Sequence, residues 1–326
     1  MDVQRPTSVK IGAKELQLPV YFPSISSVKT ALRPLDYLKV LTSFVGLNRQ
    51  FLVSAFDLAS FDNENEVAEM LVTAREAGAV TLMDSGNYES FWKDAQGRWL
   101  KNDFHKILGT FNCDLAFSFD EQHPPADFDQ HVKLVVSSWR EDQAAAGACQ
   151  IIPIIHNTAN NLPALCVAVA ENTGVSMLAV PERRLGDGIM ERAISVQTIR
   201  RELNKQGRYI ALHLLGTGNP ISIALYSAMG ADSFDGLEWC QTVVDHDTAL
   251  LYHLSQADFF TGQTRWVETD LSFHARTLAH NLEFYTEWLY RLRTSIENGM
   301  VVDFCRHNFS DRVFQQCAQV CEWKVS

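Results

Sequence analysis

The sequence lacks long apolar runs: nowhere do roughly 18 apolar residues follow one another, the length that a membrane-spanning helix needs. Its N-terminal segment has no basic stretch followed by an apolar run, which a secretory leader would require. It also lacks low-complexity linkers and Gly/Pro-rich hinges. We therefore expect neither membrane spanning nor secretion. With 46% hydrophobic and 21% charged residues, the 326-residue chain is expected to fold around one large core.

Positive charge is scarce. The chain has 28 Lys and Arg against 39 Asp and Glu, a formal net charge of -11, which argues against coating nucleic acid by bulk electrostatics but leaves a local basic groove open. The one concentration of cations is either a solvated helix face or a set of phosphate contacts. It comprises Arg183, Arg184, Arg192, Arg200, Arg201, Lys205 and Arg208.

The cysteines form an odd and scattered set. Several stand inside apolar runs, where a free thiol packs as a small hydrophobe, so we expect a reducing, cytoplasmic location. The seven are Cys113, Cys149, Cys166, Cys240, Cys305, Cys317 and Cys321.

Short apolar or β-branched runs recur along the chain, and a segment with helical periodicity follows each. Consecutive apolar residues, without alternation, are typical of parallel strands that are covered on both faces. The pattern predicts a (β/α)8 TIM barrel, and an open doubly wound sheet remains the alternative. The runs are Val20 to Ile25, Phe51 to Leu58, Ala79 to Met83, Leu115 to Asp120, Gln150 to His156, Val175 to Glu182, Tyr209 to Gly216 and Ser233 to Trp239.

The intervening helices carry start and stop signals. One is predicted to begin at Asp62 and to close at Gly78, another to run from Asp127 to Gly147, and a third over residues 188–207. After the eighth run the pattern changes to long helices, with apolar residues at three- and four-residue spacings in 278–299. We therefore expect a barrel over residues 1–257 and a C-terminal helical extension over residues 258–326.

Polar residues close most of the predicted strands, at the end where barrel enzymes carry their active sites. Any one aspartate there is also explained by a turn or a helix cap. Converging carboxylates, however, repel one another unless some are protonated, paired or facing a polar substrate, so the group points to function. It consists of Asp57, Asp84-Ser85-Gly86, Asp120-Glu121, His156-Asn157, Glu182, Gly216-Thr217-Gly218-Asn219, Asp235 and Glu238.

Carboxylates without an obvious metal cluster suggest acid/base work or attack by an aspartate on a sugar carbon. The reaction class would be glycosyl transfer or hydrolysis. The turn over 216–219 has two glycines near a predicted helix start, which would let backbone N–H groups approach an anion; the same residues also make an ordinary turn.

Three segments resemble the tRNA-guanine transglycosylase (queuine/archaeosine tRNA-ribosyltransferase) family in order and spacing. They are residues 82–89 (LMDSGNYE), 113–125 (CDLAFSFDEQHPP) and 214–236 (LLGTGNPISIALYSAMGADSFDG), and the likeness extends from 19–38 to 280–299. The resemblance implies exchange of a guanine in a polynucleotide for a 7-deazaguanine without cutting the backbone. It makes Asp235 the nucleophile toward ribose C1′, Asp84 the acid/base, and Asp120 the reader of the base's edge.

Further residues take roles by the same resemblance. Ser85, Gly86, Gly216 and Gly218 join Asp120 as substrate-binding residues, as does His156, which stands where the family usually has glutamine. This difference alters the donors and acceptors offered to the incoming base. In 179–188, AVPERRLGDG replaces the expected glycine-rich residues, so Arg183 and Arg184 become candidates for phosphate contact.

The family's zinc site is not intact. His280 matches its histidine, but residues 261–277 contain no cysteine. Cys305, His307, Cys317 and Cys321 offer four ligands at a nonstandard spacing, and free thiols are the plainer interpretation, so no cofactor is expected. Since that subdomain helps the family to grip tRNA, its loss, with the segment 233–240 (SFDGLEWC), favours DNA as the acceptor.

Alternatives remain open. The same exchange on tRNA is one, and a barrel glycosidase that uses Asp84 and Asp235 as its acid and nucleophile is another. A non-catalytic accessory subunit ranks lower, because Asp84, Asp120 and Asp235 are all present. A homodimer or helper proteins would fit the family.

Overall fold

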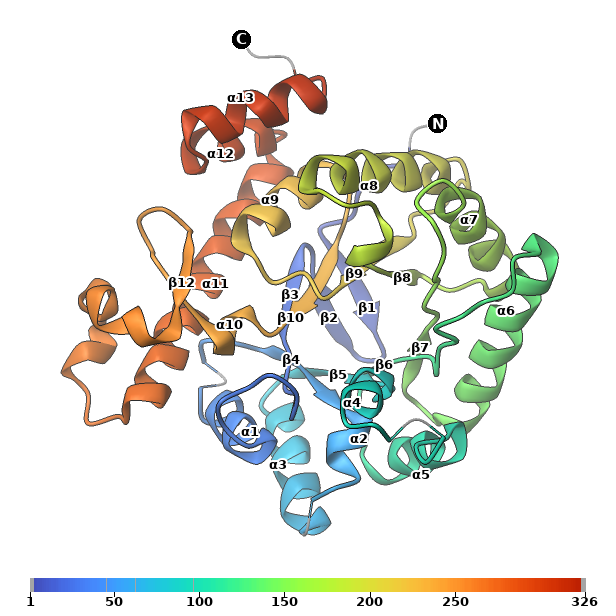
Figure 1. Ribbon diagram of the computed structural model, residues 1–326, viewed down its shortest axis with the longest axis horizontal. Coiled ribbons are helices and arrows are strands. Elements are labelled where there is room, and N and C mark those ends of the chain that lie inside the picture. The colour runs from blue at the N-terminus through green and yellow to red at the C-terminus, as the bar shows by residue number, and fades with distance from the viewer. Residues whose placement is uncertain (1–2, 45, 62, 96, 324–326) are drawn as a thin grey trace.

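The structure is a computed structural model that describes residues 3–44, 46–61, 63–95 and 97–323. It is a mixed α/β fold with two four-stranded parallel sheets, of strand order β4-β5-β6-β7 and β3-β10-β9-β8. Helices surround the strands (Figure 1). The strands are β3 (Val20–Pro23), β4 (Gln50–Ser54), β5 (Val80–Asp84), β6 (Leu115–Phe117), β7 (Gln150–Ile152), β8 (Met177–Pro181), β9 (Ala211–Leu215) and β10 (Ser233–Gly236).

The edges of the two sheets meet at both sides. An isolated parallel bridge joins Ser24, just after β3, to Leu52 in β4, and another joins Ile154, just after β7, to Ala179 in β8. A backbone hydrogen bond of 2.9 Å from Ile25 N to the Leu52 carbonyl supports the first. All eight strands therefore point their C-terminal ends toward one region.

Neighbouring residues of one strand enter different apolar clusters. In β5, Leu82 packs in a cluster between the sheets, whereas Met83 packs against the helices. The inner cluster is closed by an antiparallel hairpin, β1 (Ser8–Ile11) and β2 (Lys14–Gln17), which contributes Ile11 and Leu16. Both strand faces are thus buried, which explains why the runs in the sequence are apolar without alternation.

The helices follow the strands in turn, as the sequence predicts. The side chain of Asp127 caps α6 by accepting from Gln130 N at 2.8 Å. Asn63 caps α3, while the predicted start at Asp62 lies outside the described residues. These helices are α1 (Pro34–Ser43), α2 (Ala55–Leu58), α3 (Glu64–Glu76), α4 (Asn87–Trp92), α5 (Lys101–Thr110), α6 (Phe128–Ala145), α7 (Leu162–Thr173), η1 (Glu182–Arg184), α8 (Ile189–Asn204), α9 (Pro220–Ala228) and α10 (Glu238–Gln241).

Several predicted strands are too long, among them β6, which ends at Phe117, and β7, which ends at Ile152. In two others the chain enters a helix where the strand was predicted to continue. Strand β4 ends at Ser54 and the chain turns into α2, so Asp57 lies on a helix; β10 likewise ends at Gly236, before Glu238 opens α10. The reason is that a short apolar run has the same composition in a buried strand and in a buried helical turn.

The C-terminal helices pack on the sheet-bearing part of the chain. The ring of Tyr285 in α11 stacks on Tyr21 of β3 at 4.5 Å between centroids, and its hydroxyl donates to the Gly218 carbonyl at 2.6 Å. The predicted boundary at residues 257/258 lies within η2. This part comprises β11 (Thr242–Val244), β12 (Leu251–His253), η2 (Leu254–Phe259), η3 (Thr261–Gln263), η4 (Arg265–Glu268), α11 (Phe273–Glu297), α12 (Val301–Asn308) and α13 (Asp311–Val320).

No described helix has both the length and the apolar character to cross a bilayer. All seven cysteines are buried and free, as their positions in apolar runs predict.

Some of the clustered cations on and around α8 are structural, and they fit neither a solvated face nor a phosphate contact. Arg200 is only 8% exposed and forms an ion pair of 2.7 Å with Asp232, whose side chain is fully buried. Arg208 donates to two backbone carbonyls, those of Val175 and Ala170. A helix pattern cannot separate such a buried arginine from a solvated one, because its partner lies far away in the sequence.

Replacing Asp232 by alanine should lower the free energy of unfolding by about 3–5 kcal/mol, because the guanidinium of Arg200 would lose its buried partner. Urea unfolding at neutral pH measures the change. The control is Glu202→Ala, which removes a surface pair with Lys205 and should cost below about 1 kcal/mol. A loss for Asp232→Ala no larger than that of the control would contradict a structural role for the pair.

Candidate functional site

Three aspartates that the sequence singles out come together at the C-terminal ends of the strands. Asp84 ends β5, Asp120 follows β6 and Asp235 lies in β10. They are close enough for the charges of Asp120 and Asp235, with that of Glu89, to act on Asp84. The convergence predicted from the strand ends is therefore present for this trio.

Asp235 is held by three donors. Its Oδ1 accepts from the backbone N–H of Gly216 at 3.0 Å and lies 3.1 Å from Nε2 of His213; its Oδ2 accepts from the Ser24 hydroxyl at 3.0 Å. The other ring nitrogen of His213 is fixed at 2.7 Å from the Ser233 hydroxyl. Because these partners come from three strands or their ends, the carboxylate keeps one orientation.

Asp84 has a contrasting environment. It is half-buried, and its hydrogen bond is from the N–H of Gly86 at 3.1 Å. Burial, and then the charges of Glu89, Asp120 and Asp235, raise the pKa of Asp84 well above its usual range. Two neighbouring carboxyl groups in such different environments are suited to opposite roles, one as a proton donor and one as an anion.

Asp120 forms a pair with His156. Their Oδ2 and Nε2 atoms are 2.5 Å apart, and Asn87 Nδ2 donates to Oδ1 at 2.8 Å. Burial alone would raise the pKa of Asp120, but the hydrogen bond and charge of His156 and the hydrogen bond of Asn87 outweigh it, so the pKa is lowered. Nδ1 of His156 is buried and has no partner. The imidazole therefore keeps one free hydrogen-bonding position.

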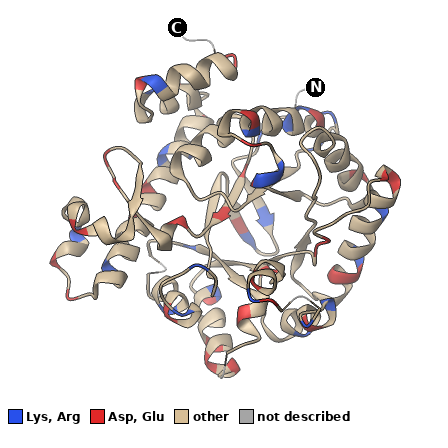
Figure 2. Ribbon diagram, viewed as in Figure 1, with Lys and Arg blue, Asp and Glu red and all other residues tan. Residues whose placement is uncertain are grey.

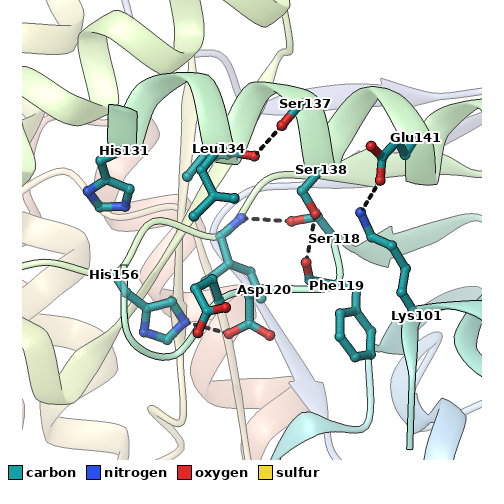
Figure 3. A pocket seen from close by; sticks show the side chains of 13 residues that line it. Lys101, Ser118, Phe119, Asp120, His131, Leu134, Ser137, Ser138, Glu141 and His156 are labelled. Carbon is teal, nitrogen blue, oxygen red and sulfur yellow. Dashed lines mark hydrogen bonds and ion pairs between the residues drawn. The ribbon is translucent and has the colours of Figure 1, made fainter. Parts of the chain in front are cut away.

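A cavity of about 240 Å³ lies beside this pair. Figure 3 shows His131 and Leu134 extending from α6 toward the loops that carry Asp120 and His156. Asp84 and Asp235 are not among the residues that line it. The cavity thus adjoins the Asp120–His156 pair, with the other two aspartates outside it.

Glu89 is a site residue that the sequence reasoning missed. It is 3% exposed, and its carboxyl oxygens accept from the Ser26 and Ser54 hydroxyls at 2.5 and 2.8 Å. Burial, followed by the charge of Asp57, raises the pKa of Glu89 to about 7. No sequence signal pointed to Glu89, because α4 has only six residues, too few for their periodicity to show which face is buried.

The glycines of the turn after β9 face carboxylates of the chain itself. Gly216 donates to Asp235, and Gly218 makes a backbone hydrogen bond to Glu238. A Cβ at Gly218 would lie 2.1 Å from Glu238 Oε2, and one at Gly236 would lie 2.3 Å from it. A Cβ at Gly218 would displace the Glu238 side chain, and one at Gly236 would also meet the backbone N of Gly218 at 2.9 Å. Burial is the main reason that the pKa of Glu238 rises to about 7.

Glu182 does not join the trio. It forms an ion pair of 3.1 Å with Arg192 and accepts from the Tyr226 hydroxyl at 2.9 Å. Asp57 is likewise occupied, by the N–H and hydroxyl of Ser27. These two carboxylates, which the sequence placed at strand ends, have partners of their own that their position in the sequence could not reveal.

Arg183 and Arg184 are linked to Asp120 through Gln122. Arg183 Nη2 donates to the side chain of Gln122 at 3.0 Å, and Arg184 Nη2 to its carbonyl at 3.2 Å. Gln122 Nε2 in turn donates to Asp120 Oδ2 at 2.5 Å. Arg183 is exposed, and in Figure 2 the η1 turn that carries both arginines is a blue patch over the strands.

His280 is buried in hydrogen bonds with this chain. Its Nε2 lies 2.8 Å from the Val244 carbonyl and its Nδ1 3.3 Å from the Thr264 hydroxyl, and burial lowers its pKa to about 4. Cys317 and Cys321 are buried, whereas His307 is exposed. Within the described part of the chain, no three His, Cys, Asp or Glu side chains are grouped to hold a metal ion.

Searches against protein-family models and curated proteins gave no match to this chain. The roles of the residues therefore depend on their geometry and on the motifs quoted above. That geometry supplies a fixed carboxylate (Asp235), a carboxyl group with a raised pKa (Asp84) and a histidine-paired carboxylate (Asp120), all at the same ends of the strands.

Glu89→Gln should flatten the dependence of stability on pH. Between the ordinary glutamate pKa of 4.5 and the value of about 7 in the folded protein, Glu89 holds a proton that the unfolded chain has released. The free energy of unfolding of the wild type should therefore fall as pH rises through this window, with Glu89 contributing up to about 3 kcal/mol. Chemical unfolding at pH 5 and pH 8, roughly the ends of the window, measures it.

The control for this experiment is Glu287→Gln, which changes an exposed glutamate on α11 and should keep the wild-type dependence. If Glu89→Gln showed the same pH dependence as the wild type, the protonated state of Glu89 would be refuted.

Proposed function

We propose that the two sheets are halves of one closed (β/α)8 barrel. Support comes from the parallel bridges at both seams, Ser24 to Leu52 and Ile154 to Ala179, and from the helix that follows nearly every strand. In such a barrel the C-terminal strand ends form a single mouth, where catalytic residues sit.

We further propose that the chain is a guanine transglycosylase, which exchanges a guanine in a nucleic acid, DNA in the first place, for a 7-deazaguanine. The observation that carries the proposal is the contrast between Asp235 and Asp84. One is an oriented carboxylate with three donors, and the other has a raised pKa that keeps a proton available. Glycosyl transfer needs both, a nucleophile for the sugar carbon and an acid for the leaving base.

The proposed reaction has two steps. A carboxylate oxygen of Asp235 bonds to C1′ of the sugar, which is deoxyribose in DNA, while the bond from C1′ to guanine breaks, and Asp84 gives its proton to the leaving base. The incoming base then attacks C1′, returns a proton to Asp84 and displaces Asp235. We assign the attack to Oδ2, because it has the single donor Ser24, whereas Oδ1 has two. The steps use groups of this chain and need no redox cofactor.

Asp120 and His156 are proposed to read the base. Asp120 offers a carboxylate edge, which suits the N–H donors of guanine-like bases, and His156 adds its unpartnered Nδ1. Since His156 replaces an amide expected from the resemblance, the incoming base would meet a ring nitrogen there. The base choice should differ accordingly.

The choice of DNA over tRNA is supported by the part of the chain where the family has zinc. Residues 261–277 contain no cysteine, and His280 is held by Val244 and Thr264. The zinc site of the subdomain that helps the family to bind tRNA is thus missing its cysteines in this chain. Comparing the two polymers as acceptors decides between them.

The decisive experiment is label exchange. Guanine or a 7-deazaguanine carrying a radiolabel is incubated with protein and either DNA or tRNA, and label in the polymer is counted. We expect incorporation into DNA, and a loss of at least ~10³-fold for Asp235→Asn, which removes the nucleophile. A covalent complex between protein and polymer should form with the wild type in the absence of incoming base and should be missing with Asp235→Asn.

The matched control is Glu182→Gln, since this strand-end carboxylate pairs with Arg192 and Tyr226 and should leave the rate nearly unchanged. Incorporation into tRNA and not DNA would move the proposal to the other acceptor. Absence of label in both polymers, or an unchanged rate for Asp235→Asn, would refute the proposed reaction.

Asp120→Asn should mainly weaken binding of the base. The loss of a charged acceptor predicts a KM for the free base roughly 10- to 100-fold higher, with a smaller change in kcat. Initial rates at varied base concentration and fixed polymer measure both constants. Asp129→Asn, an exposed change at the start of α6, should leave KM as in the wild type. A fall in kcat at constant KM would argue against base reading by Asp120.

A further inference from the structure

Helix α4 carries its aromatic residues on the outside. Tyr88, Phe91 and Trp92 are 37%, 58% and 50% exposed, while Glu89 and Ser90 of the same helix are buried. The ring of Trp92 meets those of Phe91 and Tyr88 edge to face, at 5.5 and 6.4 Å between centroids. We call these three residues the aromatic rim. A contiguous exposed patch of this kind is typical of a binding surface.

The aromatic rim lies next to the proposed site. Helix α4 begins directly after Asp84, Ser85 and Gly86, and its first residue, Asn87, binds the carboxylate of Asp120. The rim is therefore attached to the same loop as the proposed acid.

Cations accompany the rings. Lys29 Nζ lies 3.6 Å from the centre of the Trp92 ring. Lys93, the residue that follows Trp92, is exposed. The exposed Arg183, held by Gln122, is close enough for its charge to act on Tyr88. The chain as a whole has a net charge of -11, but here cations lie beside exposed aromatic rings. Such a surface suits a nucleic acid, whose phosphates bind cations and whose bases stack on rings.

We propose that the aromatic rim binds the unpaired nucleotides of a DNA strand that flank the target guanine, with bases stacked on Phe91 and Trp92 and phosphates near Lys29 and Arg183. This rests on the proposed function in its choice of DNA. Removing a base from the stack leaves its neighbours without a stacking partner, and exposed rings can replace that partner for any base. The rim would thus hold the strand while Asp120 and His156 read the base.

The test is binding of a fluorescently labelled single-stranded DNA oligonucleotide that contains one guanine, measured by anisotropy with no free base present. Phe91→Ala and Trp92→Ala should each weaken binding roughly 5- to 150-fold, as expected for the loss of one stacked base. Trp92→Phe keeps a ring and should retain most of the affinity. The control Phe259→Ala removes an aromatic residue that is 80% exposed on η2 and should change nothing.

A second readout follows the charge. Lys29→Ala should reduce the slope of log affinity against log salt by about 1, because one phosphate contact is lost. Lys205→Ala, which changes an exposed lysine just after α8, should keep the wild-type slope. An unchanged slope for Lys29→Ala would overturn the assigned phosphate contact.

The outcomes separate this inference from the exchange reaction. If label exchange occurs but Phe91→Ala and Trp92→Ala bind DNA as the wild type does, the rim proposal is overturned and the reaction stands. If the variants lose binding while exchange fails in every polymer, the reaction fails and the rim stands. Tighter binding of an RNA oligonucleotide of the same sequence through these residues would overturn the DNA assignment, and self-association lost in the variants, without DNA binding, would indicate a second copy instead.

Discussion

Mutual repulsion of the carboxylates is the constraint on which the site depends. The charges of Asp120 and Asp235 both act on Asp84 at one end of the strands, and each of the three carboxyl groups is accommodated differently. Asp235 receives N–H and O–H donors, Asp120 pairs with an imidazole, and Asp84 has a raised pKa. Because the environments differ, Asp84 is suited to act as an acid and Asp235 as an anion. The proposed chemistry requires both.

At the opposite ends of the strands, buried aspartates are neutralised by arginines. Asp232, just before β10, is paired with Arg200, and Asp114, just before β6, with Arg75 at 3.0 Å. Among the ion pairs of the described residues, the three aspartates of the site have histidine partners or none. An arginine at a buried carboxylate would fix its charge and remove a proton donor. The stabilising ion pairs and the proposed reactive carboxyl groups are therefore placed at different ends of the same strands.

The sequence predicted the strand order in the chain and the trio of aspartates, because strand ends converge whenever parallel strands lie side by side. The sequence could not predict which carboxylates are already paired with other side chains, as Glu182 and Asp57 are. The donor from Ser24 to Asp235 spans 211 positions in the sequence, and no local pattern encodes it. Glu89 was missed for a related reason: its burial follows from Ser26 and Ser54, and a short helix of six residues gives too little periodicity to show which face is inside.

The orientation of α4 connects the acidic interior of the site to its surface. Glu89 points inward to its serine partners, whereas Phe91, two residues later, lies on another side of the helix and is turned to solvent, as is Trp92. A polyanion approaching this end of an acidic protein meets less repulsion where Glu89 and Asp84 have raised pKa values, and attraction at Lys29. Deprotonation of Glu89 adds a negative charge to the helix that carries the rim, so binding of DNA should weaken as pH rises through about 7, the pKa of Glu89. The raised pKa of Asp84 acts in the same direction, because its proton is also lost as pH rises.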